Sequence, residues 1–160
     1  MLENELSFLV GELPDLGGAA RKEIEQHYLS AGPSPLRLRR IGDGFELTKK
    51  LDLDPADMSR KEEITVPLTA EEFQRLRPLA IRSLAKMRCY LPLTGGLTAE
   101  IDVFHGGLEG LTMVEVEFPD ETSRRSFVPP PWFGRDVSQE DWSANSYLAG
   151  KNLDDIKEFL

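Results

Sequence analysis

The chain has 160 residues, of which 40% are hydrophobic and 29% are charged, a composition typical of a globular protein with many charges to place. Its formal net charge of -9 argues against duplex nucleic acid as the main partner, because a duplex binder needs a basic face. One cysteine cannot form an internal disulfide, and no segment approaches the roughly 18 apolar residues of a membrane span, so we expect one cytoplasmic domain over residues 1–160.

The first two predicted elements are a strand and a helix. Residues 3–10 alternate between charged and apolar side chains, which is the period of a strand. Residues 19–30 follow a loop rich in glycine, proline and aspartate. They carry Ile24, His27 and Tyr28 at helical spacing, and the prolines after them end the predicted helix.

A hairpin, a strand and a capped helix are predicted next. Residues 36–41 and 45–51 flank a Gly-Asp-Gly turn, which favours a β-hairpin. An acidic loop leads to a strand at residues 60–66. Thr69 followed three residues later by Glu72 is a capping-box pattern, and it predicts a short helix that ends before a proline.

In the second half of the chain, the sequence predicts three strands followed by helices. The strands are residues 81–91, 98–104 and 111–118. Ser138 and Asp141 form a second capping-box candidate, which predicts a helix to about residue 149. Asn152 is a candidate cap for a final short helix. Strands joined by hairpins with few helices indicate an α+β protein dominated by an antiparallel sheet.

The predicted strands share an unusual charge pattern. Each has an apolar face and a charged face, and together the charged faces carry both signs. The charged positions are Glu3, Glu5, Arg37, Arg39, Lys50, Arg82, Lys86, Arg88, Glu100, Asp102, Glu115 and Glu117. A solvated face of a one-sided sheet explains any one strand, but successive solvated faces usually include uncharged polar residues. In a closed barrel these charges would line a tunnel, where a polyanion and a divalent cation would compensate both signs.

Short motifs along nearly the whole chain resemble, in order, those of the CYTH or triphosphate tunnel family. They are ENELSFLV (3–10), IEQHYLS (24–30), LRLRR (36–40), LTKK (47–50), RKEEI (60–64), KMR (86–88), EIDVF (100–104), VEVEF (114–118), FVPPPWFGRDVS (127–138) and NSYLA (145–149). One E-x-E motif has little specificity, whereas the ordered series is specific. The resemblance implies an eight-stranded antiparallel barrel, the triphosphate tunnel, with helices packed outside.

The resemblance also implies roles for the charged residues, although it assigns no catalytic residue. The ligands of Mg²⁺ or Mn²⁺ would be Glu3, Glu5, Asp102, Glu115 and Glu117. The phosphate groups would be bound by Arg37, Arg39, Lys50, Arg60, Lys86 and Arg88. Alternation from Arg60 favours Glu62 over Glu63 as a further acid that faces inward.

Two departures from the family pattern concern activity. The family has a lysine beside the phosphates where this chain has Ser7, and an Arg-Tyr pair where it has Trp142-Ser143. The expected function is that of a metal-dependent triphosphatase acting on inorganic triphosphate or a triphosphorylated organic compound. The alternatives are a class IV-like adenylyl cyclase and a non-catalytic module that binds polyphosphate or nucleotides. The sequence leaves the oligomeric state open, a homodimer included.

Overall fold

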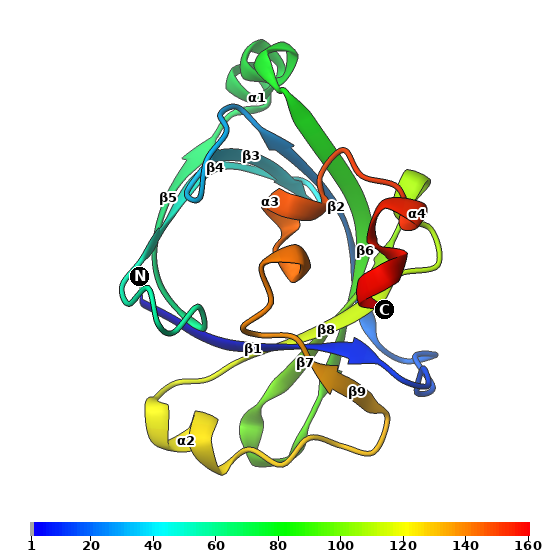
Figure 1. Cartoon of the computed structure of the whole chain (residues 1–160). Coiled ribbons are helices and arrows are strands. Elements are labelled where there is room, and N and C mark those ends of the chain that lie inside the picture. Colours follow the sequence, from blue (N-terminus) through cyan, green and yellow to red (C-terminus); the bar gives the residue numbers. More distant parts are fainter. Residues whose placement is uncertain (1) are drawn as a thin grey trace.

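The computed structural model describes residues 2–160, whose backbone forms one antiparallel sheet of nine strands that curls into a barrel (Figure 1). The strands are β1 (Leu2–Val10), β2 (Ala20–Tyr28), β3 (Leu36–Ile41), β4 (Gly44–Asp52), β5 (Arg60–Leu68), β6 (Arg82–Pro92), β7 (Thr98–Phe104), β8 (Thr112–Glu117) and β9 (Phe133–Asp136). Their order in the sheet is β5-β4-β3-β2-β6-β7-β8-β1-β9, and a further pairing of β5 with β1 closes the ring. The predicted eight-stranded antiparallel barrel is confirmed, with β9 as an addition.

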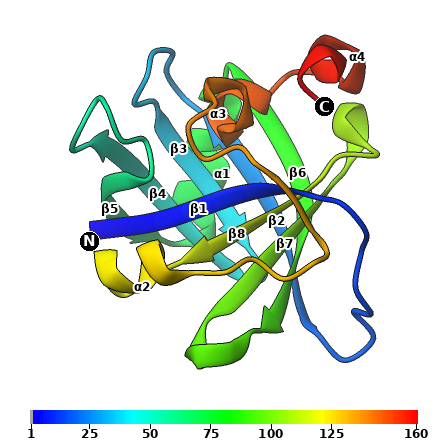
Figure 2. The same ribbon diagram turned by 60° about the horizontal axis from the view of Figure 1, so that its bottom comes forward.

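Strand β1 closes the barrel because its two edges have different partners. One edge pairs with β8, while the other pairs with β5 over its first three residues and with β9 at its end. Figure 2 shows β1 running across the barrel wall, with α2 (Glu121–Ser126) close to its start. Because side chains alternate along a strand, Glu3, Glu5 and Ser7 share the tunnel face, and Phe8 lies on the opposite face.

Two apolar clusters stabilise the barrel, one outside its wall and one inside one end. The outer cluster consists of Phe8, Cys89, Ala99, Ile101, Val114, Val116, Phe118 and Phe133, against which Phe127 and Trp132 pack. The inner cluster consists of Tyr28, Leu84, Phe104, Leu108, Leu111, Met113, Val137, Trp142, Leu148, Ala149 and Ile156. Leu84 has the same strand phase as Lys86, and Met113 has that of Glu115, so these members project inward. The inner cluster therefore fills one end of the barrel and leaves the rest to charged residues.

The helices are short and have different places. α1 (Ala70–Leu76) begins at the predicted capping box of Thr69 and Glu72, and α4 (Leu153–Ile156) begins at a capping box led by Asn152. α1 and α2 lie outside the barrel, as expected, but α3 (Asn145–Leu148) lies over the tunnel opening (Figure 1). None of the helices among residues 2–160 has the length and apolar character needed to cross a membrane.

Two predicted helices are wrong. Within residues 19–30, Ala20–Tyr28 form β2, whose two edges pair with β3 and β6 and whose last three residues are buried on both faces. Ile24 and Tyr28 face one side and His27 the other, and the spacing of these three residues also fits a helix. Residues 138–149 form a 3₁₀ turn and the short α3, because Ser138 Oγ accepts a hydrogen bond from the Ser7 backbone N–H instead of capping a helix.

Candidate active site in the barrel tunnel

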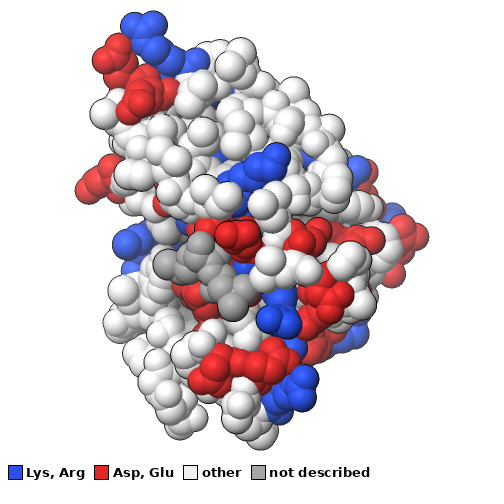
Figure 3. Space-filling view, turned by 90° about the vertical axis from the view of Figure 1, so that its left-hand side faces the viewer, with Lys and Arg blue, Asp and Glu red and all other residues white. Residues whose placement is uncertain are grey.

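The barrel contains two adjoining cavities. The serine cavity is lined by Ser7, Ser59, Ser138, Ser143 and Ser146, with Lys61 among its other lining residues. The glutamate cavity is lined by Glu3, Glu63, Glu100 and Glu117, with Arg39 and Arg88 among its others. Both cavities are lined by Glu5, Arg37, Lys50, Glu115 and Asn145. They are therefore two halves of one charged tunnel. Figure 3 shows acidic and basic side chains close together on the face that contains the start of β1.

Asp102 on β7 lies between two cations of β6. Lys86 Nζ donates a hydrogen bond to Asp102 at 2.6 Å, and Arg88 donates to both carboxylate oxygens of Asp102 at 2.7 Å. Arg88 also donates to Glu115 at 2.7 Å and to Glu100. Asp102 is 1% exposed and Lys86 is fully buried. Instead of the separate metal and phosphate ligands that the sequence predicts, Asp102, Lys86 and Arg88 neutralise one another in the structure.

The pKa values in this ion cluster follow from the same contacts. Burial alone would raise the pKa of Glu115, but Arg88, Lys86 and Lys50 outweigh it and lower that pKa to about 2. Burial lowers the pKa of Lys86, and Asp102 opposes that change. Burial would lower the pKa of Arg88 as well, but Asp102 and Glu115 raise it further than burial lowers it. Glu115 and Arg88 are therefore both charged at neutral pH.

Lys50 on β4 contacts several carboxylates. Its Nζ lies 2.8 Å from Glu3, 3.9 Å from Glu5 and 3.8 Å from Glu63. Burial raises the pKa of Glu3 to about 7, and the neighbouring Glu63 and Glu5 add to the rise while Lys50 opposes it. The coupled Glu63 has its pKa lowered to about 2, because Glu3, Lys50 and Thr65 together outweigh its burial. Three carboxylates thus share one ammonium group, so negative charge is in excess at this point of the tunnel.

Arg37 on β3 is a buried cation with unused hydrogen-bonding capacity. Its side chain is 8% exposed, and its Nε and Nη2 atoms have no hydrogen-bond acceptor among the described residues. The contact with Glu63 is long, at 3.8 Å. The neighbouring inward-facing Arg39 is paired, since its Nε donates to Glu46 at 2.6 Å. Burial and the nearby Arg37 lower the pKa of Arg39, and Glu46 opposes them.

The prediction that Arg60 faces the tunnel is wrong. The register of β5 pairs Lys50 with Glu63 and Glu3 with Lys61, so Lys61 and Glu63 share the tunnel face. Both line the cavities, whereas Arg60 and Glu62 fall on the opposite face. The prediction that Glu62 faces inward in place of Glu63 is also wrong, because it assumed that Arg60 faces the tunnel and that Glu62 has the same strand phase.

The carboxylates of the glutamate cavity fit a hard divalent cation in their chemistry. Glu5 and Glu117 are direct cross-strand partners, and burial followed by repulsion from Glu5 raises the pKa of Glu117. Burial also raises the pKa of Glu100. Within residues 2–160, no three of these side chains converge closely enough to surround an ion in their present positions. A cation with oxygen ligands would relieve the repulsion that these raised pKa values report.

Sequence reasoning missed several tunnel residues, among them Lys61, Glu63, Asn145 and Tyr28. Lys61 and Glu63 were missed through the one-residue error in the phase of β5. Asn145, whose Oδ1 atom accepts from Lys86 at 3.1 Å, lies in a segment predicted as one long helix. Tyr28 was assigned to a helix in place of β2. The NSYLA motif was the one signal that could have drawn attention to Asn145.

Comparisons with known proteins find similar sequences, one of them over most of the chain. No family model matches the chain. It is 37% identical over 153 residues to the inorganic triphosphatase of Nitrosomonas europaea, and the match covers 93% of this chain and 97% of the relative. A second inorganic triphosphatase, from Acetivibrio thermocellus, is 40% identical over 63 residues, which is 39% of each chain.

Solved structures show the same architecture. A crystal structure of an inorganic triphosphatase superposes with a TM-score of 0.68 at 34% identity, covering 92% of this chain and 93% of that one. A putative adenylyl cyclase from Hippeastrum, described as having a dominant triphosphatase activity, has a TM-score of 0.55 at 12% identity, with coverage of 78% and 82%. The latter likeness supports the fold alone.

Proposed function

Because this chain belongs to the inorganic triphosphatases of the CYTH or triphosphate tunnel family, we propose that it hydrolyses inorganic triphosphate to phosphate and pyrophosphate inside its tunnel. The reaction would take place in the passage formed by the serine and glutamate cavities. We further propose that the metal is Mg²⁺ or Mn²⁺. Residues 1–160 would form a single domain. We also place the protein in the cytoplasm, which suits a chain whose one cysteine, Cys89, is a buried free thiol.

The observation that carries the proposal is the state of Arg37. A buried guanidinium with two nitrogen atoms lacking acceptors is costly unless a ligand supplies oxygens. Phosphate oxygens match the planar donors of arginine, and charge-assisted hydrogen bonds of this kind are strong. Arg37 lines both cavities, so a polyphosphate running through the tunnel would contact it.

Hydrolysis requires an anionic chain and an attacking water molecule to be held together. Arg37 and Lys50 provide positive charge near the middle of the tunnel, where charge develops on the bridging oxygen as the bond breaks. A divalent cation, when bound, would neutralise phosphate charge and orient water. Glu3, Glu5 and Glu117 would hold it, since Asp102 is occupied by its two cations. The ion cluster of Lys86, Arg88, Asp102 and Glu115 would keep the tunnel wall in place.

The test compares three substrates under matched conditions. Purified protein is incubated with tripolyphosphate, ATP or thiamine triphosphate, each with Mg²⁺, Mn²⁺ or a chelator, and phosphate, pyrophosphate and cyclic AMP are quantified. We expect tripolyphosphate to give equal amounts of phosphate and pyrophosphate, with no turnover in the chelator. Cyclic AMP from ATP would support a cyclase instead, and binding without any product would support a binding module.

A further inference from the structure

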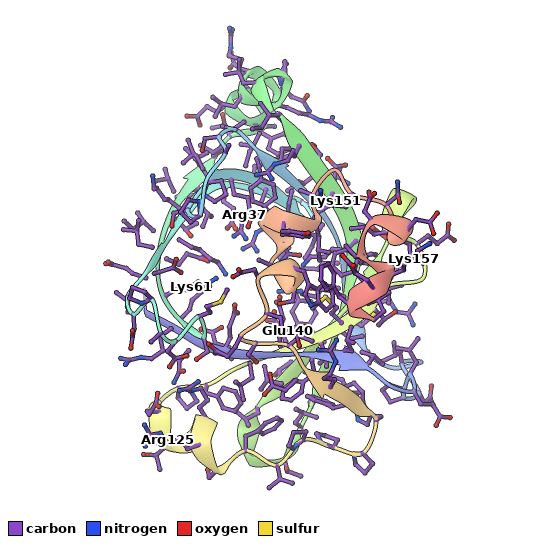
Figure 4. All side chains as sticks on the ribbon, viewed as in Figure 1. Arg37, Lys61, Arg125, Glu140, Lys151 and Lys157 are labelled. Carbon is purple, nitrogen blue, oxygen red and sulfur yellow. The ribbon has the colours of Figure 1, made fainter. Side chains whose placement is uncertain are left out.

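Lys61 is a cation of the tunnel to which the sequence motifs assign no role. It lies on β5, opposite Glu3 of β1 on one side and Asp52 of β4 on the other. Its side chain lines the serine cavity, and Figure 4 shows it directed into the barrel interior from the β5 wall. Glu63, the next inward-facing residue of β5, belongs to the glutamate cavity. Lys61 therefore belongs to the other half of the tunnel.

Lys61 differs from the other inward lysines in its partners. Lys86 is bound to Asp102, and Lys50 lies within 4.0 Å of three carboxylates. Among residues 2–160, by contrast, no carboxylate lies within the 4.0 Å ion-pair distance of the Lys61 ammonium. Its cross-strand neighbour Glu3 is engaged by Lys50 at 2.8 Å. The positive charge of Lys61 is thus available to a ligand of the serine cavity.

The serine cavity is built for an anionic end group. Lys61 and Arg37 enter it from the β5 and β3 walls, and hydroxyl groups such as those of Ser7 and Ser146 supply hydrogen-bond donors. A terminal phosphoryl group carries more charge than a bridging one and has three oxygens to bind, which suits a flexible ammonium with three donors. The acids of this cavity, Glu5 and Glu115, are near Lys50 and Arg88 respectively.

We propose that Lys61 binds the terminal phosphoryl group of the triphosphate in the serine cavity and so sets which end of the substrate faces the glutamate cavity. This inference rests on the proposed function, and it adds a substrate-binding residue and the orientation of the bound triphosphate in the tunnel. Position 7 lines the same cavity from β1, so an ammonium introduced there would enter the cavity that contains the side chain of Lys61. The two positions are expected to be interchangeable in part.

The first experiment uses adjacent residues on opposite faces of β5. Lys61→Gln removes the ammonium from the cavity, and Arg60→Gln removes one positive charge from the outer face. Both variants lose the same net charge, so any difference between them reflects location. We expect Lys61→Gln to lower kcat/KM for tripolyphosphate by roughly tenfold to a hundredfold, mainly through KM, because one charge-assisted hydrogen bond is lost. Arg60→Gln should stay within about twofold of the wild type.

The second experiment tests interchange of the two positions. Ser7→Lys is made in the wild type and in Lys61→Gln, and the four kcat/KM values form a double-mutant cycle. We expect Ser7→Lys to restore much of the activity lost in Lys61→Gln and to change the wild type far less. Equal effects of Ser7→Lys in both backgrounds would show that Lys61 does not act in this space.

Folding and function are separated by two controls. All variants are compared with the wild type for melting temperature, and Lys61→Arg, which keeps the charge, should retain most of the activity. Equal kinetics of Lys61→Gln and Arg60→Gln in an active wild type would overturn the role of Lys61 and leave the triphosphatase intact. A wild type that is inactive and is not stabilised by tripolyphosphate would overturn both.

Discussion

Asp102 holds two cations in a nearly solvent-free part of the barrel wall, and that position determines what its loss would do. Its carboxylate accepts from Lys86 and Arg88, and the three side chains are almost fully buried. Removing one partner of a buried ion cluster leaves the others with unpaired charge, which costs more than the pair contributes. We therefore expect loss of Asp102 to lower mainly stability, and loss of Arg37, which has spare donors, to weaken mainly substrate binding.

We expect Asp102→Asn to lower the free energy of unfolding by about 3 kcal/mol or more, because two buried cations lose their counter-ion. Glu100→Gln is the matched control. Glu100 also contacts Arg88, but its side chain is 28% exposed, so its loss should cost roughly 1 kcal/mol or less. Urea denaturation of both variants measures the difference. Equal costs would show that Asp102 is not the centre of the cluster.

Glu3 makes the stability of the metal-free protein depend on pH. Its pKa is about 7 in the folded chain and 4.5 as the ordinary value. Between these values the unfolded chain has lost a proton that the folded chain retains, so stability falls as pH rises from 4.5 to 7. The coupled Glu63, whose pKa is lowered from 4.5 to about 2, contributes stability that is fully present above pH 4.5 and is lost as pH falls from 4.5 to 2, so it adds no slope within the Glu3 window.

Glu3→Gln should flatten this pH dependence in the metal-free protein. It should also raise stability at pH 8 by an amount on the order of 1 kcal/mol, because a partly solvated repulsion is removed. Melting temperatures of wild type and variant from pH 5 to pH 8 in a chelator provide the measurement. A wild type whose stability rises over this range would contradict the assignment, and so would a variant that is less stable at pH 8.

At the scale of elements, β9 depends on a close approach to β1 that only glycine allows. A Cβ at Gly134 would lie 2.9 Å from the backbone oxygen of Leu9, and backbone atoms cannot move aside as a side chain can. This approach lets Phe133 reach the outer cluster, where its ring packs against Phe8 at 5.0 Å. The added strand therefore fixes the segment that leads to α3.

Gly134→Ala should destabilise the protein by about 1–3 kcal/mol through displacement of β9. Gly18→Ala is the matched control, because a Cβ there meets nothing within 4 Å and its backbone is not left-handed. Thermal unfolding compares the two, and hydrogen exchange of the β9 amides should rise only in Gly134→Ala. An unperturbed Gly134→Ala protein would show that β9 can shift without cost.

The sequence predicted those elements whose local signals agree with their surroundings. The hairpin of β3 and β4 and the cap at Thr69 have such signals, and both were predicted correctly. β2 was missed because its end at Gln26–Tyr28 is buried on both faces, so burial there does not alternate from residue to residue. The helix predicted from Ser138 to about residue 149 was too long, since only Asn145–Leu148 form α3, because Ser138 bonds to β1, a contact that depends on tertiary structure.

The tunnel residues were predicted where strand phase was clear and missed where it was ambiguous. The motifs placed Glu3, Glu5 and Arg37 in the tunnel, and they line its cavities. In the run Arg60-Lys61-Glu62-Glu63 both phases contain one cation and one acid, so the pattern cannot distinguish them. Only the register with β1 and β4 selects Lys61 and Glu63.

At the scale of the whole molecule, the tunnel keeps both signs of charge in a protein of net charge -9. Excess acid lies around Lys50, while Arg37 and Lys61 have positive charge to spare. A cation and a polyphosphate bound together would compensate both, so each should favour binding of the other.

We therefore expect Mg²⁺ and pyrophosphate together to raise the melting temperature by more than the sum of their separate effects. Pyrophosphate is chosen because, as the product, it is not turned over during a scan. Free concentrations are matched across samples to allow for the complex that the two form in solution. Purely additive shifts would mean that the two sites are independent, and this account of the tunnel would be wrong.

The pairing of β1 also bears on when the protein becomes functional during synthesis. β1 precedes the other strands in the chain, yet its partners lie at residues 60–62, 113–117 and 133–136. Such distant pairings form slowly, because the chain must lose the entropy of closing long loops before the stabilising contacts between the strands can form. Glu3 and Glu5 can join Glu115 and Glu117 only after β8 has left the ribosome, and Asn145 follows later still. β1 therefore lacks part of its pairing until β8 and β9 have been made, and the tunnel is completed only when Asn145 has joined it.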